Sequence, residues 1–191
     1  TKNLGTMGDG GLAVTNSETL KNRMIALRNH GGAVRYYHDE IGVNSRLDEI
    51  QAAILRVKLN YINDWNKARR AHAAYYNELF KDAKNIETPK EIDNVYAVYH
   101  QYTVKIPNRD DVHKLLQEAG IGAMIYYPVP LHLQKVHAHL NLKEGLLPHT
   151  EKDTKMVLSL PMFAEITEEE QRTVAKTLIE CVEKCKTTAA V

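Results

Sequence analysis

The first sixteen residues, Thr1–Asn16, read TKNLGTMGDGGLAVTN, and they decide the fold that we expect for this chain. Lys2 stands directly before a glycine-rich turn, and the apolar run Leu12–Thr15 that follows is expected to form a short β-strand. A turn rich in glycine leaves room for a planar ligand or a close backbone. A desolvated lysine loses its proton readily, so Lys2 is a candidate for a Schiff base with a carbonyl cofactor. The alternative is an ordinary solvated surface lysine.

Composition and charge exclude several classes of function. The formal net charge of the 191 residues is +1, so nothing points to nucleic acid. No apolar run is long enough to span a membrane. The two cysteines, Cys181 and Cys185, lie in a late helical pattern, which argues against a disulfide or zinc framework and favours the reducing cytoplasm.

A polar and aromatic stretch, NHGGAVRYYHDEIGVNSRLDE, occupies residues 29–49. Loops with this many hydrogen-bonding groups often carry function, although a solvated linker has the same composition. Arg46 is notable within it, because the guanidinium fork suits phosphate or carboxylate.

The longest periodic pattern in the chain begins at Leu47 and continues to Leu79. Its apolar residues recur in steps of three or four, which predicts one face of a helix. Such a helix would run roughly 50 Å at the usual rise per residue. That length is too great for one small core, so we expect the helix to bridge two domains or to contact a partner subunit.

The second half of the sequence predicts a smaller unit. A strand is expected at Tyr99–Ile106, then a helix that begins near Asn108 and ends at Gly120, then a strand at Ile121–Tyr127. This order favours a βαβ-like or split α+β domain. A capping box, Thr167 with Glu170, opens the final helix.

The stretch YYPVPLHLQ, residues 126–134, follows the last of those strands. Its two prolines fix the backbone and hold His132 on a rigid loop. His132 is read either as a surface histidine or as part of a site. A metal site with His137 and His139 is not predicted, because their spacing does not fit ligand geometry.

Four stretches occur in one order: TKNLG with GDGG, then YxH…GxNxRLDE, YPxPLHxQ and LSLPM. In this order they resemble the DegT/DnrJ/EryC1/StrS sugar aminotransferases, which use pyridoxal phosphate (PLP). The resemblance implies an α/β, aspartate aminotransferase-like fold (PLP fold type I). Residues 1–46 would end the large PLP-binding domain, residues 47–85 would form the interdomain helix, and residues 86–191 would form the small C-terminal domain. The chain would then be about the C-terminal half of a longer enzyme.

The resemblance also implies roles for individual residues. Lys2 would bind PLP covalently and then act as general base and acid. Asn44 would bind the cofactor phosphate of the neighbouring subunit, so we expect a homodimer with shared active sites. The candidate contacts to the nucleotide-sugar substrate are Tyr37, His38, Arg46, Tyr127 and His132.

The reaction implied is transfer of an amino group from an amino acid, glutamate in the first instance, to a keto-sugar nucleotide. Two alternatives stand beside it. Some relatives carry histidine in place of the lysine and are dehydratases, which Lys2 argues against. The chain is otherwise a non-catalytic fragment, or a dimerisation or regulatory module, that lacks most of the PLP pocket.

Overall fold

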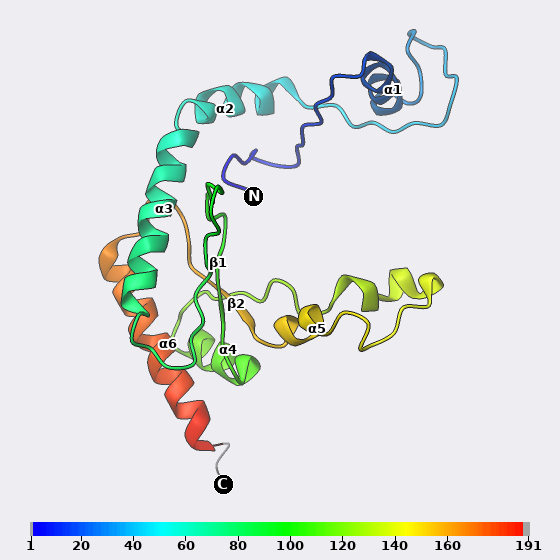
Figure 1. Ribbon diagram of the computed structural model, residues 1–191. Coiled ribbons are helices and arrows are strands. Elements are labelled where there is room, and N and C mark those ends of the chain that lie inside the picture. Colours follow the sequence, from blue (N-terminus) through cyan, green and yellow to red (C-terminus); the bar gives the residue numbers. More distant parts are fainter. Residues whose placement is uncertain (1, 189–191) are drawn as a thin grey trace. The chain divides into compact units, whose positions relative to one another are not determined.

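The computed structural model describes residues 2–188 and divides the chain into two compact units, residues 1–62 and 63–191 (Figure 1). The first unit holds two α-helices and the start of a third: α1 (Glu18–Arg28), α2 (Glu49–Leu59) and α3 (Ile62–Leu79). The second holds, after α3, two strands, two 3₁₀ helices and three α-helices: β1 (Tyr102–Lys105), α4 (Arg109–Glu118), η1 (Leu131–Leu133), η2 (Lys135–Leu140), α5 (Pro148–Thr154), β2 (Val157–Leu160) and α6 (Glu168–Thr188).

Local signals at both ends of α1 explain its bounds. The Ser17 hydroxyl accepts a hydrogen bond from the Leu20 amide at 3.3 Å, which caps the first turn. The chain then leaves the helix, and the amide of Gly31 donates to the carbonyl of Ala26 at 2.9 Å. Gly31 has φ +80°, and a Cβ there would lie 1.7 Å from the Glu40 carbonyl oxygen. Only glycine allows this turn to close.

The predicted strand at Leu12–Thr15 is wrong, because these residues form no strand. A strand exists through hydrogen bonds to a neighbouring strand, and this extended segment pairs with none among residues 2–188. Leu12 is 92% exposed and Val14 is 84% exposed, so their side chains are not covered within the described residues either.

The single helix predicted over residues 47–85 is two helices, α2 and α3, interrupted at Asn60 and Tyr61. The amides of these two residues bond to carbonyls only three residues back, at Val57 and Lys58, which tightens and closes the last turn of α2. The apolar spacing continues through Tyr61, so the sequence pattern does not indicate the break between α2 and α3. The domain boundaries expected at 46/47 and 85/86 stay predictions.

The sheet of the second unit is antiparallel. Strand β1 pairs with β2, with Tyr102 opposite Leu160 and Lys105 opposite Val157. The strand predicted at Ile121–Tyr127 is reduced to one bridge, in which Met124 and Ser159 exchange both backbone hydrogen bonds. Pairing stops there as the chain approaches two prolines, which have no amide to donate. Because β1 and the segment at Met124 pair antiparallel with β2 on its two sides, they run parallel to each other and are joined through α4, which agrees with the split α+β arrangement expected from the sequence.

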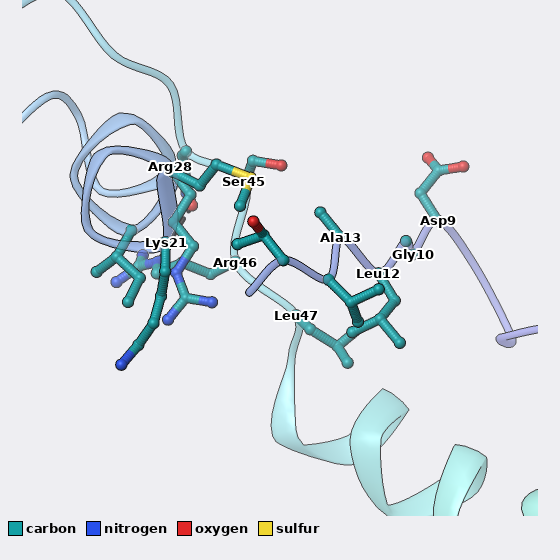
Figure 2. A pocket seen from close by; sticks show the side chains of 15 residues that line it. Asp9, Gly10, Leu12, Ala13, Lys21, Arg28, Ser45, Arg46 and Leu47 are labelled. Carbon is teal, nitrogen blue, oxygen red and sulfur yellow. Dashed lines mark hydrogen bonds between the residues drawn. The ribbon is translucent and has the colours of Figure 1, made fainter. Parts of the chain in front are cut away.

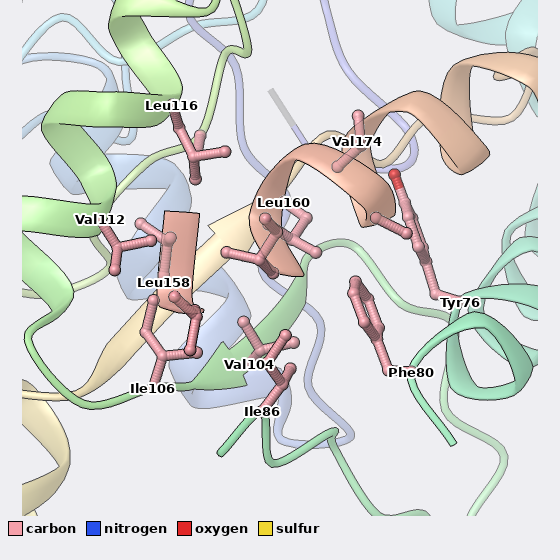
Figure 3. Packing of buried hydrophobic residues seen from close by; sticks show 14 of the residues in the cluster. Tyr76, Phe80, Ile86, Val104, Ile106, Val112, Leu116, Leu158, Leu160 and Val174 are labelled. Atoms are coloured by element: carbon pink, nitrogen blue, oxygen red, sulfur yellow. The ribbon is translucent and has the colours of Figure 1, made fainter. Parts of the chain in front are cut away.

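The hydrophobic core lies in the second unit. Figure 3 shows the leucines of β2 between side chains of α4 on one side and, on the other, the rings of Tyr76 in α3 and of Phe80 just after it. Tyr76 is at its centre: its ring stacks on Phe80 and Tyr102, with centroids 6.0 and 4.9 Å away, and its hydroxyl donates to the Pro161 carbonyl at 3.0 Å. The apolar face of α6 is buried in this core: Val174, Leu178, Cys181, Val182 and Cys185.

The predicted capping box at the start of α6 is confirmed. The Glu170 amide donates to the Thr167 hydroxyl at 3.2 Å, and the Glu170 carboxylate accepts from the Thr167 amide at 2.8 Å. These bonds hold the pKa of Glu170 below its ordinary value, mainly through the Thr167 amide. The amides of Thr167 and Glu170, at the start of the helix, therefore each have a side-chain acceptor.

We expect Thr167→Ala to lower the free energy of unfolding by about 1 kcal/mol, because it removes the cap acceptor. Urea unfolding followed by circular dichroism measures the change. Thr173→Ala, in the interior of the same helix, is the matched control and should be neutral or slightly stabilising. Equal losses in both variants would contradict a capping role.

Candidate functional site

The segment that follows Lys2 is held by helix α2. The Gln51 side chain exchanges two hydrogen bonds with the backbone of Met7, each 2.8 Å long, and Lys58 donates to the carbonyl of Gly5. Gln51 and Lys58 are seven residues apart, so they lie on one face of the helix. The turn after Lys2 is thus fixed, while the Lys2 side chain itself is exposed.

The loop that carries Asn44 folds back onto the end of α1. Asn44 forms a bridge with Asn29, and the Val43 amide donates to the Leu27 carbonyl at 2.8 Å. At Gly42 the backbones approach so closely that a Cβ would lie 2.1 Å from the nearest amide nitrogen. The loop therefore places Asn44 beside the C-terminal turn of α1.

A cleft of about 1020 Å³ lies within this first unit (Figure 2). The glycine-rich segment forms one wall, and residues of α1 and of the Asn44 loop form the rest. Three cationic side chains reach it, from Lys21, Arg28 and Arg46, and Figure 2 shows them at the opposite end of the view from Asp9. A cleft with this excess of positive charge suits an anion.

Arg46 orients the amide of Asn44. The Arg46 Nε donates to the Asn44 Oδ1 at 3.1 Å. Because the amide oxygen is engaged by this cation, the Nδ2 of Asn44 remains as a hydrogen-bond donor. Asn44 and Arg46 both line the cleft, so they present a donor and a positive charge on one wall. This is a donor set that a phosphate group accepts.

The structure brings together only some of the predicted site residues. Asn44 and Arg46 line the cleft, whereas Lys2, Tyr37 and His38 are not among the residues that line it. Tyr37 is exposed. The His38 Nδ1 lies 3.1 Å from the His30 carbonyl oxygen, so this histidine closes its own loop.

Sequence reasoning missed Lys21 and Arg28 as site residues. Both line the cleft, together with Met24 and Ile25 between them. Their positions i, i+3, i+4 and i+7 mark one face of a helix, and this spacing was the available signal.

The two predicted site residues of the second unit have different environments. Tyr127 is 64% exposed and available for contact. His132 is buried, and its Nε2 lies 3.0 Å from the Oε1 of Glu151, which is buried as well. The pKa of Glu151 is lowered, first by the hydrogen bond from the Gly145 amide and also by those from Leu147 and His132. His132 thus already has a protein partner on one ring nitrogen.

The described part of the chain has neither a cluster suited to a metal ion nor a helix that could cross a membrane. Among residues 2–188, no group of three or more His, Cys, Asp or Glu side chains is arranged to hold a metal ion. Within the same range, each helix is too short or too polar to cross a lipid bilayer.

Comparison with known proteins identifies the family. The model of the DegT/DnrJ/EryC1/StrS aminotransferase family matches residues 1–179. The chain belongs to this family. Membership accounts for the order of the glycine-rich segment, the Asn44 loop and the LSLPM strand, and it confirms the resemblance seen in the sequence.

Similar proteins match this chain over about half of their own length. A pleiotropic regulatory protein of Geobacillus stearothermophilus is 50% identical, over 94% of this chain and 49% of its own. A UDP-N-acetyl-3-dehydro-alpha-D-glucosamine 3-aminotransferase of Acidithiobacillus ferrooxidans is 41% identical, over 88% of this chain and 45% of its own. The chain therefore spans about half the length of the curated relatives it matches.

A solved structure of another family member confirms the expected fold. The crystal structure of DesV from S. venezuelae, in complex with a ketimine intermediate, is 38% identical to this chain. It superposes with a TM-score of 0.87 over 95% of this chain and 49% of DesV. The α/β fold of the PLP-dependent aminotransferases in the DegT/DnrJ/EryC1/StrS family is thus the fold of this chain.

Proposed function

We propose that this chain acts in a PLP-dependent aminotransferase that moves an amino group from an amino acid, glutamate in the first instance, to a keto-sugar nucleotide. The observation that carries the proposal is the cationic cleft of the first unit, in which the Asn44 amide donor stands beside Arg46. The names of the relatives support the reaction class, because several are aminotransferases or transaminases of nucleotide sugars.

The residues of the cleft fit the phosphate of PLP. Asn44 offers its Nδ2 because Arg46 engages its oxygen. Lys21 and Arg28 add positive charge at the same end of the cleft (Figure 2). We propose that Asn44 binds the cofactor phosphate across the two-fold axis of a homodimer, and that the cations neutralise it or the diphosphate of the substrate.

Lys2 is the proposed catalytic residue. When bound, PLP supplies the electron sink that stabilises negative charge on the substrate carbon. The Lys2 amine would bind the cofactor covalently through Nζ and afterwards carry the proton to and from that carbon. The exposed amine and the fixed turn behind it, held by Gln51, suit this role.

We propose that Tyr37 and Tyr127 contact the substrate, since both are exposed. His38 keeps a proposed substrate contact only through its Nε2, because its Nδ1 faces the His30 carbonyl. For His132 the geometry favours a supporting role over direct contact, because its Nε2 faces Glu151.

A second candidate is a non-catalytic dimerisation or regulatory module. One observation favours it: one relative at 50% identity is a pleiotropic regulatory protein. The two candidates differ in one property, which is covalent PLP at Lys2.

We expect the protein, incubated with PLP and reduced with borohydride, to carry the cofactor on Lys2 because only a covalent imine is fixed by reduction. Peptide mass mapping locates the label, with Lys58 and Lys67 as internal controls that should remain unlabelled. Intact mass of every polypeptide in the sample shows which chains take part. Specific labelling supports the enzyme. A folded but colourless protein with no label on Lys2 overturns the proposed function and supports the module.

A further inference from the structure

A long excursion leaves the second unit between the end of the proline-rich stretch and helix α5. It comprises residues 131–147, with η1 and η2, and Figure 1 shows it projecting from the sheet in yellow-green. His132 is its one buried residue. Large apolar side chains along it are exposed, namely Leu131, Val136, Leu140, Leu142, Leu146 and Leu147. Burial of apolar surface within the described residues therefore does little to hold this excursion in place.

One carboxylate ties the two ends of the excursion together. Glu151 is 8% exposed and stands in α5. Its Oε1 faces His132 Nε2 at 3.0 Å and accepts from the Leu147 amide at 3.1 Å. Its Oε2 accepts from the Gly145 amide at 2.8 Å. The beginning and the end of the excursion thus both contact the Glu151 side chain. We call this cluster, Glu151 with His132, Gly145 and Leu147, the neck.

The chemistry of the neck fixes the form of His132. An ionised carboxylate only accepts hydrogen bonds, so the ring nitrogen that faces it carries the hydrogen. The hydrogen therefore sits on Nε2. The other ring nitrogen, Nδ1, is buried and has no hydrogen-bond partner within residues 2–188. The bonds that lower the pKa of Glu151 keep it in the ionised form that this arrangement requires.

The neck lies close in sequence to the proposed substrate residue Tyr127. Pro128 and Pro130 stand between Tyr127 and His132 and restrict the backbone there. Pro130 is buried as well. A fixed His132 therefore limits where Tyr127 can lie.

We propose that Glu151 is a positioning residue: through His132 and the amides of Gly145 and Leu147 it closes the neck of the excursion and sets the position of Tyr127 toward the nucleotide-sugar substrate. The part that concerns substrate rests on the proposed function. The closure of the neck does not, so the two can fail separately.

The first test measures the neck directly. Hydrogen exchange is compared for the wild-type protein, Glu151→Ala and Glu151→Gln. We expect the Gly145 and Leu147 amides to exchange about tenfold faster or more in Glu151→Ala, because each loses a hydrogen bond to a charged group. Glu151→Gln keeps one oxygen acceptor and should lie between. Amides of the core strands, at Val104 and Leu158, should be unchanged, which shows that the variants fold.

Glu144→Gln is the matched control, because it removes a carboxylate from the same excursion. Glu144 is exposed, and it forms an ion pair with Lys155 at 3.8 Å on the surface. Its exchange pattern should equal that of the wild type. If the Gly145 and Leu147 amides exchanged at unchanged rates in Glu151→Ala, or equally fast in Glu144→Gln, the proposal that Glu151 closes the neck would be wrong.

The second test measures positioning in the transamination assay. We expect Glu151→Ala to raise KM for the sugar nucleotide about tenfold, as loss of an ordered contact predicts, while KM for the amino-acid donor stays the same. Glu151→Gln should restore part of the affinity. Faster exchange with an unchanged KM would overturn the positioning role and leave the proposed function intact. A wild-type protein without transaminase activity would overturn the proposed function and the positioning role together, and leave the neck intact.

Discussion

Replacement of Lys2 by alanine is expected to abolish transamination while leaving the fold unchanged. The amine is the proposed covalent attachment for PLP and the group that moves the proton at the substrate carbon. Loss of a general acid–base alone lowers rates by about 10²–10⁴-fold, and loss of the covalent link adds to this. Lys2 is exposed, so truncation removes no packing. The measurement is initial rate with a keto-sugar nucleotide and an amino donor, beside a circular dichroism spectrum.

Two further variants make the result specific. Lys2→Arg keeps the positive charge, but the guanidinium does not lose its proton, so it should be as inactive as the alanine variant. Lys67→Ala removes an exposed lysine whose salt bridge to Asp64 lies on the surface of α3, and it should keep wild-type activity. Full activity in Lys2→Ala would disprove the catalytic role of this residue.

The largest loss of stability is expected for Tyr76→Ala, at about 3–5 kcal/mol in the free energy of unfolding. The ring is fully buried and stacks on Phe80 and Tyr102, so truncation leaves a cavity between α3 and β1. Urea denaturation measures the loss. The neighbouring Tyr75 is only partly buried, and its hydroxyl accepts from Arg172, so Tyr75→Ala should cost clearly less. Equal losses would show that Tyr76 is not the centre of the core.

Tyr76→Phe removes the hydroxyl and keeps the ring, so it isolates the contribution of the hydroxyl to the pH dependence of stability. Burial raises the pKa of both Tyr76 and Tyr102 above its ordinary value. Above pH 10 the unfolded chain releases these protons and the folded chain retains them, so stability present below that pH is lost as pH rises. The slope is at most about 1.4 kcal/mol per pH unit for each tyrosine. Tyr76→Phe should show a shallower slope, and an unchanged slope would contradict the assignment.

Local signals were enough to predict much of the fold. Ser17 caps α1 and the Thr167–Glu170 box opens α6 because each uses only residues within one turn. The apolar face of α6 follows from helical spacing alone. The partner of β1 could not be predicted from residues 121–127, because pairing with β2 is decided by packing between distant segments. The break at Asn60 was hidden for a different reason, since Tyr61 continues the apolar period.

The site divides in the same way. Asn44 and Arg46 were predicted from a sequence pattern, and the structure places them on one cleft. Glu151 was not predicted, because two of its three partners are backbone amides, and sequence does not mark which amides converge on a side chain. The buried state of His132 was missed for the same reason, because its carboxylate partner stands on another element.

The two hydrogen bonds between Gln51 and Met7 bear on which residues can occupy position 7 in members of the family. The side-chain amide of Gln51 has the same donor and acceptor groups as a peptide bond, and it forms hydrogen bonds only with main-chain atoms of Met7. The Met7 side chain is 74% exposed and takes no part in these hydrogen bonds. Position 7 can therefore drift in sequence while the turn behind Lys2 keeps its register. The register of that turn therefore depends on Gln51 of α2, which is far from Met7 in the sequence.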